Sequence, residues 1–309
     1  MVPNMGSIGA SAVRLSHKPT FMESFRMRGQ LKVKIRDAVD NVEMSTVGVA
    51  FSGGLDSSLL ARICKEAGRN VTLLTVAFSR PRDIKISSDT AKALDLGILH
   101  DIVSPEDLEH GLKTVLSMIE FERIARLENC LCFHYVFRLA SRHGIRTVLS
   151  ANGIDELFCG YDLYRRSFGD NSGIVDLMYT LVETAKKDKK EVSKLSALSG
   201  IEYVCPFLSA GFVDFAMKIP VEFKIKSKDD NLRKHILREV ALELGVPRSA
   251  ALRAKKAFQY SSGLHKAVTK LAKKRGFKRE YARAAGFSGE MEAYMDLLKT
   301  EIGQQQSKD

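Results

Sequence analysis

The sequence has 309 residues, and its 48 Lys plus Arg against 37 Asp plus Glu give a formal net charge of +11. Hydrophobic residues make up 45% and charged residues 28%, a composition typical of globular proteins rather than disordered chains. The five cysteines include no C-x-x-C pair, which excludes a disulfide scaffold and a zinc ribbon and indicates reduced thiols in the cytoplasm. No apolar run reaches the roughly 18–20 residues that a membrane span needs.

Short apolar runs alternate with amphipathic segments in the first half of the chain, after an expected flexible tail at residues 1–20. Strands separated by helices predict βαβ units and a mostly parallel sheet. The expected strands are Val47–Phe51, Val71–Phe78, 98–103 and Ile145–Ser150. The expected helices of this half are 22–43, Ser57–Gly68, 89–97, Pro105–Glu120 and 133–144.

Strand signals fade after about residue 160, where only helical patterns follow, at 173–200, 209–218, 230–244 and 263–283. The sequence therefore predicts a single α/β domain at residues 21–285, with a doubly wound, mostly parallel sheet and a helical C-terminal cap. Its sheet part covers about 45–165 and its helical part 166–285. A C-terminal helix and a polar tail are expected at 286–309.

The most specific motif is SGGLDSS, Ser52 to Ser58, which follows the first expected strand and opens a helix. Ligands bind at this end of strands in open α/β sheets. Gly53 and Gly54 let backbone N–H groups approach an anion, and the helix N-terminus adds positive potential. Asp56 fits such an anion site if it holds a Mg²⁺ that bridges phosphate oxygens. A Walker loop is excluded because its Gly-Lys-Ser/Thr ending is missing.

A second unusual feature is the basic stretch from Lys266 to Arg283, which holds eight basic residues and one acid, Glu280. It predicts either an RNA- or phosphate-binding patch or a solvated helix face beside an anionic nucleotide site. No aromatic residues are interleaved in the manner of an RNA-binding platform, apart from Phe277 and Tyr281. RNA is therefore kept as an alternative partner.

The motif SGGLDSS resembles the pyrophosphate loop of the N-type ATP pyrophosphatases. Three further segments are similar to asparagine synthetases: VLSANGIDELFCGY (Val148–Tyr161), CPFLSAGFVDFAMKIPVEFKIK (Cys205–Lys226) and LRKHILREVALELGVPRSAALRAKKAFQ (Leu232–Gln259). Together they resemble the synthetase half of glutamine-dependent asparagine synthetase and of β-lactam synthetase. The resemblance implies an adenine nucleotide alpha hydrolase-like fold that uses ATP and Mg²⁺ to adenylate a carboxylate, aspartate in the nearest relatives, and then to form an amide.

The resemblance also implies roles for individual residues. Asp56 and Asp155 would be the metal carboxylates, and Lys255 would stabilise charge during adenylation and amide formation. Glu202 matches a family carboxylate upstream of the PFL segment. The nucleotide would contact Ser52, Gly53, Gly54, Asp56, Ser57, Ser58, Val76, Ser150, Ala151 and Lys234.

Each of these residues also has a structural interpretation that stays open. Asp56 and Asp155 follow strands, where a carboxylate can simply cap a helix. Lys234 and Lys255 lie in basic stretches and can be solvated surface residues, as can Glu202. Glu156 can be a metal ligand or an acid in the first turn of a helix.

The sequence departs from the family where the amino-acid substrate is recognised. Asn152 stands where asparagine synthetases carry Glu and β-lactam synthetases carry Tyr, and an amide cannot accept a proton or carry charge. Ser209 replaces the Asp after PFL, and Glu191 and Ser193 replace an Arg and an Asn. The missing base is expected to be supplied by Glu202 or Glu156, unless the substrate differs.

The 45 or so residues before the first strand are too few for the glutaminase domain of the family. We therefore expect free ammonia or a separate glutaminase subunit as nitrogen source, and the chain can also form a homo-oligomer. Cys159, in place of a family glycine, leaves two alternatives: an RNA-modifying enzyme with a reactive thiolate, or a buried hydrophobic cysteine. A non-catalytic ATP-binding subunit is a third interpretation of the whole chain.

Overall fold

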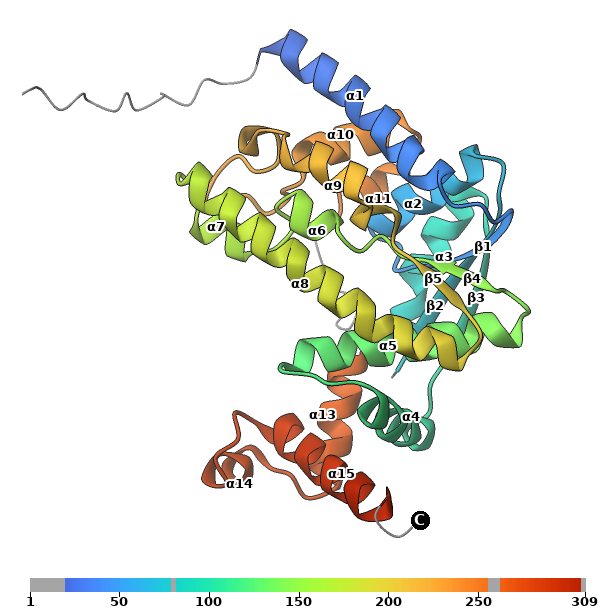
Figure 1. Cartoon of the computed structure of the whole chain (residues 1–309), viewed down its shortest axis with the longest axis vertical. Coiled ribbons are helices and arrows are strands. Elements are labelled where there is room, and N and C mark those ends of the chain that lie inside the picture. The colour runs from blue at the N-terminus through green and yellow to red at the C-terminus, as the bar shows by residue number, and fades with distance from the viewer. Residues whose placement is uncertain (1–19, 79–81, 255–261, 307–309) are drawn as a thin grey trace, which may run out of the picture.

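The computed structural model describes residues 20–78, 82–254 and 262–306. Within these ranges, five strands form one sheet in the order β3-β2-β1-β4-β5, and every neighbouring pair is parallel (Figure 1). The strands are β1 (Thr46–Ala50), β2 (Asn70–Ala77), β3 (Gly97–Ile102), β4 (Thr147–Leu149) and β5 (Glu202–Val204). The predicted parallel α/β fold is confirmed.

Helices cover both faces of the sheet, which makes it doubly wound (Figure 1). Those between Phe21 and Arg142 are α1 (Phe21–Asp40), α2 (Leu55–Glu66), α3 (Arg82–Leu94), α4 (Pro105–Met118) and α5 (Ile124–Arg142). The later ones are α6 (Ile154–Leu157), α7 (Leu163–Arg166), α8 (Asn171–Leu198), α9 (Ala210–Met217), α10 (His235–Glu243), α11 (Arg248–Ala251), α13 (Leu264–Lys274), α14 (Arg279–Ala284) and α15 (Glu290–Gln306). Two 3₁₀ turns, η1 (Pro206–Leu208) and η2 (Val221–Phe223), flank α9.

Alternation along β2 divides the core into two layers. Val71 and Leu73 pack on the face covered by α1, α2 and α10, whereas Leu74 and Val76 pack against α4, α5 and α8. Successive side chains of a strand point to opposite faces, so a strand buried on both sides is apolar throughout. This explains why β2 is mostly apolar in the sequence, with apolar residues on both faces.

Several sequence expectations differ from the structure. The helix expected at 89–97 is α3, which begins at Arg82, and the helix expected at 230–244 is α10, which begins only at His235. β5 was not predicted, because three residues are too few to produce a period-2 pattern. The single helix expected at 263–283 is wrong: the chain breaks between α13 and α14, where Gly276 adopts a φ of +90°. The helix expected to begin at residue 133 begins at Ile124, since its first turns are buried nearly all round and lack an amphipathic pattern.

The N-terminal helix begins with a capping box. The Thr20 hydroxyl accepts a hydrogen bond from the Glu23 N–H at 3.2 Å, and the Glu23 carboxylate accepts one from the Thr20 N–H at 2.7 Å. Of the expected tail at residues 1–20, residues 1–19 lie outside the described residues, and Thr20 caps α1. Among the helices that are described, none combines the length and the apolar composition needed to cross a bilayer.

One lysine, Lys224, is buried beside α8, next to a small third group of buried apolar side chains. Lys224 is fully buried, and its ammonium donates a hydrogen bond to the Ala216 carbonyl at 2.8 Å. It lies 5.8 Å from the ring centroid of Phe158 and forms no ion pair with any residue that the structure describes. Burial lowers the pKa of this ammonium to about 7.

We expect Lys224 to make stability depend on pH. In the unfolded chain the lysine stays protonated up to about pH 10.5, so between pH 7 and pH 10.5 the unfolded state binds more protons. The free energy of unfolding should therefore rise with pH in that window, by about 2–3 kcal/mol from pH 7 to pH 9 relative to Lys224→Met. Urea unfolding at both pH values measures this change, with Lys228→Met, an exposed lysine, as control. Parallel pH profiles for wild type and Lys224→Met would refute the prediction.

Candidate functional site

The loop between β1 and α2 contains the glycine motif and is pre-shaped by internal hydrogen bonds. The Ser57 hydroxyl accepts a hydrogen bond from the Ser52 N–H at 3.3 Å, and the Ser52 hydroxyl accepts one from the Gly54 N–H at 3.4 Å. Gly53 has a φ of +69°, and a Cβ there would lie 2.9 Å from the Ile86 carbonyl oxygen on α3. The position therefore requires glycine for both its backbone conformation and its packing.

Helix α2 begins directly after this loop, without a side-chain cap. Its N-cap, Gly54, has no side chain to bond the first N–H groups of the helix. Ser58 is fully buried, and its hydroxyl has no hydrogen-bond partner in the described part of the chain. Asp56 lies in the first turn with its side chain 17% exposed. An anion can bind to such N–H groups, and the nearby carboxylate calls for a cation.

A second loop follows β4, which pairs directly with β1. It carries Ser150, Ala151 and Asn152, and Gly153 with a φ of +104° turns the chain into α6, where Asp155 lies. The sheet order reverses between β1 and β4, because β2 and β3 lie on one side and β5 on the other. Such a switch point is where open α/β sheets bind ligands.

Lys234 joins the two loops. Its Nζ donates hydrogen bonds to both oxygens of Asp56, at 2.8 and 2.6 Å, and lies 2.6 Å from Oδ1 of Asp155. The lysine side chain is 2% exposed. Because both carboxylates contact the same nitrogen atom, the structure brings together Asp56, Asp155 and Lys234.

The backbone that carries Lys234 is held in a rare conformation. Arg233 and Lys234 have φ values of +49° and +55°, a left-handed region that costs free energy for residues other than glycine. The Asp230 carboxylate accepts a hydrogen bond from the Arg233 N–H at 2.9 Å, and the Arg233 guanidinium donates to the Gly160 carbonyl.

A buried arginine secures the same bend from the other side. The Arg238 guanidinium is buried and donates to the carbonyls of Leu232, Arg233, Ala251 and Arg253. It thereby ties the Lys234 bend to the end of α11. Sequence reasoning did not identify Arg238 as a site residue.

Gly160 makes room for the charged group. A Cβ at this position would lie 2.5 Å from Cε of Lys234 and closer still to Oδ1 of Asp155. Any side chain here would push the lysine and the carboxylate apart. Gly160 therefore belongs to the site, although the sequence analysis did not single it out.

Asn152 is anchored by a tyrosine from the unpredicted strand. Its Nδ2 donates a hydrogen bond to Oη of Tyr203 at 3.1 Å, and that hydroxyl also bonds the Ser150 hydroxyl at 2.9 Å. Burial raises the pKa of Tyr203, so its hydroxyl stays protonated. Tyr203 was missed because β5 was missed. The second loop and β5 are thus joined by a network of side-chain hydrogen bonds.

The remaining predicted site residues are not all part of this group. Val76 is fully buried near the carboxyl end of β2, and Ala151 is partly exposed beside Ser150. Glu202 is the first residue of β5 and bonds Thr147, the first residue of β4. The site lies at the other, carboxyl end of these strands, so the structure does not support Glu202 as a catalytic residue. Lys255 lies outside the described residues.

Glu156 and Cys159 follow the second loop, and both have structural contacts: Glu156 is hydrogen-bonded and Cys159 is buried. The Glu156 carboxylate accepts a hydrogen bond from the Tyr161 hydroxyl at 2.6 Å. Cys159 is fully buried, and burial raises the pKa of its thiol to about 12. A protonated, buried thiol is a poor nucleophile. The structure therefore favours the buried hydrophobic cysteine over the reactive thiolate.

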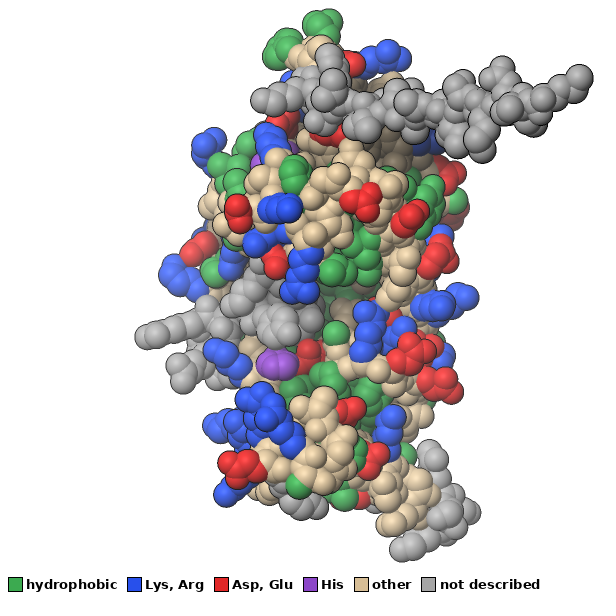
Figure 2. All heavy atoms as spheres, turned by 90° about the vertical axis from the view of Figure 1, so that its left-hand side faces the viewer, with side chains coloured by type: hydrophobic (Ala, Val, Ile, Leu, Met, Phe, Trp, Pro, Cys, Tyr) green, Lys and Arg blue, Asp and Glu red, His purple; other side chains and the backbone are tan. Residues whose placement is uncertain are grey.

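The basic stretch forms exposed helix faces at one end of the molecule. Lys266, Lys270, Lys273 and Lys274 are exposed on α13, and Figure 2 shows Lys and Arg side chains gathered near the lower end, where Figure 1 places α13 to α15. Part of this charge is paired locally, as in the 3.4 Å contact between Lys273 and Glu290. RNA binding by this surface stays a prediction.

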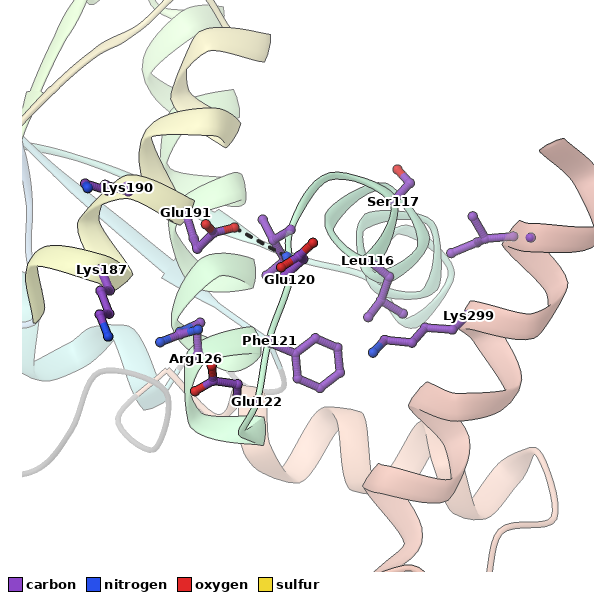
Figure 3. Close-up of a pocket in the computed structure, with 13 residues that line it drawn as sticks. Leu116, Ser117, Glu120, Phe121, Glu122, Arg126, Lys187, Lys190, Glu191 and Lys299 are labelled. Atoms are coloured by element: carbon purple, nitrogen blue, oxygen red, sulfur yellow. Dashed lines mark hydrogen bonds between the residues drawn. The ribbon is translucent and has the colours of Figure 1, made fainter. Parts of the chain in front are cut away.

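A cavity of about 680 Å³ lies elsewhere, between the α4–α5 connection, α8 and α15 (Figure 3). Lys187, Lys190 and Arg126 line one side of it, and Lys299 from α15 lies 4.1 Å from the centroid of the Phe121 ring. Two of its lining charges are paired within the protein, Arg126 with Asp188 and Glu191 with Lys194. None of the sequence-predicted site residues lines this cavity.

The donor set fits Mg²⁺ bound together with phosphate. Asp56 and Asp155 supply two carboxylates, and no cluster of three His, Cys, Asp or Glu residues suited to a metal occurs in the described ranges. Mg²⁺ is commonly held by one or two carboxylates, with substrate phosphates and water completing its coordination. The free N–H groups at the start of α2 suit those phosphates.

Comparisons with known proteins match most of the chain to one family. The family described as "Asparagine synthase" matches residues 30–178 and 174–307. The chain is 28% identical over 291 residues to a putative glutamine-hydrolysing asparagine synthetase of Methanocaldococcus jannaschii, covering 84% of this chain and 52% of that protein. It is 29% identical over 254 residues to asparagine synthetase B of Escherichia coli, covering 77% and 45%. The chain therefore spans about half the length of these curated relatives.

Among solved structures, the chain is similar to the NMN synthetase of Francisella tularensis, with a TM-score of 0.40 and 15% sequence identity. The match covers 79% of this chain and 86% of that one. At this TM-score the likeness carries no conclusion about function.

We expect Gly160→Ala to disrupt the charged group, because the added methyl would overlap Asp155 and Lys234. Overpacking should lower the free energy of unfolding by about 1–3 kcal/mol. It should also weaken ATP·Mg²⁺ binding about tenfold or more. Thermal denaturation and calorimetric titration measure these effects. The matched control is Gly211→Ala on α9, where a Cβ meets no atom within 4 Å. Equal behaviour of the two variants would contradict the assignment.

Proposed function

The chain belongs to the asparagine synthase family, and from this premise we propose that it is an ATP-dependent ligase that activates a carboxylate and forms an amide. The observation that carries the proposal is the convergence of Asp56 and Asp155 on one point beside the glycine loop. Two acidic residues beside an anion-binding loop suit a site for a metal–triphosphate complex.

In the proposed site, the triphosphate lies over Ser52–Ser58, where N–H groups and serine hydroxyls serve as donors. Asp56 and Asp155 hold Mg²⁺, which supplies positive charge to the pyrophosphate leaving group when bound. Lys234, released from part of its carboxylate contacts, supplies a further cation to the phosphates. Fixed donors aimed at developing negative charge lower the barrier of such a reaction.

The proposed reaction has two steps. An oxygen of the substrate carboxylate attacks the α-phosphorus of ATP, and the bond to the β-phosphate oxygen breaks to release pyrophosphate. The nitrogen of ammonia then attacks the acyl carbon of the adenylate, the C–O bond to AMP breaks, and the attacking nitrogen loses a proton to a base. Lys255, by its resemblance to the family lysine, would stabilise the charge in both steps.

We propose aspartate as the first substrate to test, with ammonia as the nitrogen donor, free or delivered by a glutaminase subunit. The relatives named above are described as glutamine-hydrolysing, and this chain matches about half of their length. The identity of the substrate carboxylate is a separate question, because Asn152 stands where asparagine synthetases carry Glu. Its amide, hydrogen-bonded to Tyr203, can donate and accept hydrogen bonds but cannot take up the proton that the attacking ammonia loses.

We expect the purified chain to catalyse exchange of pyrophosphate into ATP in the presence of its carboxylate substrate. Screening aspartate and other carboxylates with ATP and Mg²⁺ identifies that substrate. Asp56→Asn should lower the exchange rate about 100-fold or more, because it removes a charged metal ligand. Asp296→Asn, a change of an exposed residue on α15, should leave the rate unchanged. If no carboxylate supports exchange while ATP·Mg²⁺ still binds, the ligase proposal fails.

The next prediction concerns the hydrogen bonds around Asn152. Tyr203→Phe removes the hydroxyl that bonds both Asn152 and Ser150, and a buried hydrogen bond contributes about 0.5–1.5 kcal/mol. With the carboxylate that the exchange screen identifies, its KM should rise about tenfold while the KM for ATP changes little. Tyr179→Phe on the exposed face of α8 is the control. An equal rise in both KM values would mean that Tyr203 only supports the fold.

A further inference from the structure

Three carboxylate oxygens surround one ammonium at the heart of the site. Nζ of Lys234 lies within 2.8 Å of both oxygens of Asp56 and of Oδ1 of Asp155. We propose that Lys234 is a built-in counter-ion that competes with the divalent metal, so that the site takes the metal together with the nucleotide and not alone. The inference rests on the nucleotide site of the proposed function and adds how that site admits its metal.

The geometry makes the competition direct. Mg²⁺ binds carboxylate oxygens at about 2.0–2.1 Å, so it needs the same oxygens that the ammonium contacts. An ammonium has three N–H donors, and three oxygens already surround this one. A metal must therefore displace Nζ from at least one carboxylate, which leaves a buried cation in need of another acceptor.

A bound triphosphate removes the competition between the metal and the Lys234 ammonium for the carboxylate oxygens. Its oxygens offer new acceptors to the displaced Lys234 and complete the coordination of the metal. Metal and nucleotide should then strengthen each other's binding by the same factor, since such coupling is reciprocal. Metal alone gains no such compensation.

The Lys234 side chain cannot leave the site when a metal binds, because the fold fixes the backbone that carries it. The bend at Arg233 and Lys234 is held by the Asp230 carboxylate and by the buried guanidinium of Arg238. Gly160 packs against the lysine stem, and the side chain is 2% exposed. The displaced ammonium therefore stays within the site, where phosphate oxygens are the acceptors that the proposed function supplies.

The test is a titration with Mn²⁺ alone, followed by electron paramagnetic resonance, in the absence of nucleotide and of any carboxylate substrate. The wild type should bind Mn²⁺ weakly, and Lys234→Met should bind it at least tenfold more tightly. Adding α,β-methylene-ATP should strengthen Mn²⁺ binding strongly in the wild type and much less in Lys234→Met. Lys228→Met, an exposed lysine, should behave as the wild type. Circular dichroism checks the fold, and Lys234→Gln replaces the methionine variant if that one unfolds.

The outcomes separate this inference from the ligase proposal. If the wild type binds Mn²⁺ alone as tightly as the lysine variants, the counter-ion role is wrong, whatever the exchange assay gives. If neither protein binds Mn²⁺ even with the analogue, the metal site itself is refuted and the counter-ion role with it. The predicted difference in Mn²⁺ affinity, observed in a chain without pyrophosphate exchange, would support the counter-ion role while the ligase proposal fails.

Discussion

The pairing of β1 with β4 is the constraint on which the site depends. Because these parallel strands are neighbours, the loops after them open at the same edge of the sheet and bring together residues about one hundred positions apart in the sequence. The strand order reverses at this pair, which is the kind of switch point where open α/β sheets bind ligands. Asp56 lies in the first turn of α2 and Asp155 in α6, and both carboxylates contact the Lys234 ammonium.

The sequence predicts those parts of the site whose signal is local. A buried strand followed by Ser-Gly-Gly marks the first loop, and the segment around Asp155 follows a strand in the same way. Parallel topology then requires both loops to lie at one edge, so the meeting of Asp56 and Asp155 could be expected. Lys234 was placed near the phosphates by resemblance alone, and its contact with both carboxylates depends on the bend that Asp230 and Arg238 hold.

Other parts could not be predicted, for physical reasons. Three residues of β5 carry too little periodicity to indicate a strand, so Tyr203 had no assigned place and the anchoring of Asn152 was invisible. The same omission misled the interpretation of Glu202. Without a register for β5, nothing indicated that this carboxylate starts the strand and therefore lies at the edge opposite the site. The presence of Asn152 is thus visible in the sequence, but its hydrogen bond to Tyr203 is not.

The charged group is better explained by function than by stability. Burying two carboxylates and an ammonium costs desolvation free energy that their mutual attraction often fails to recover. Two consecutive left-handed residues add strain, at about 1–3 kcal/mol each. Arg238 and Asp230 use their hydrogen bonds to hold that strained bend in place instead of relaxing it. A fold selected for stability alone would place apolar residues here, whereas the proposed metal–phosphate site needs charges that are fixed, balanced and able to exchange partners.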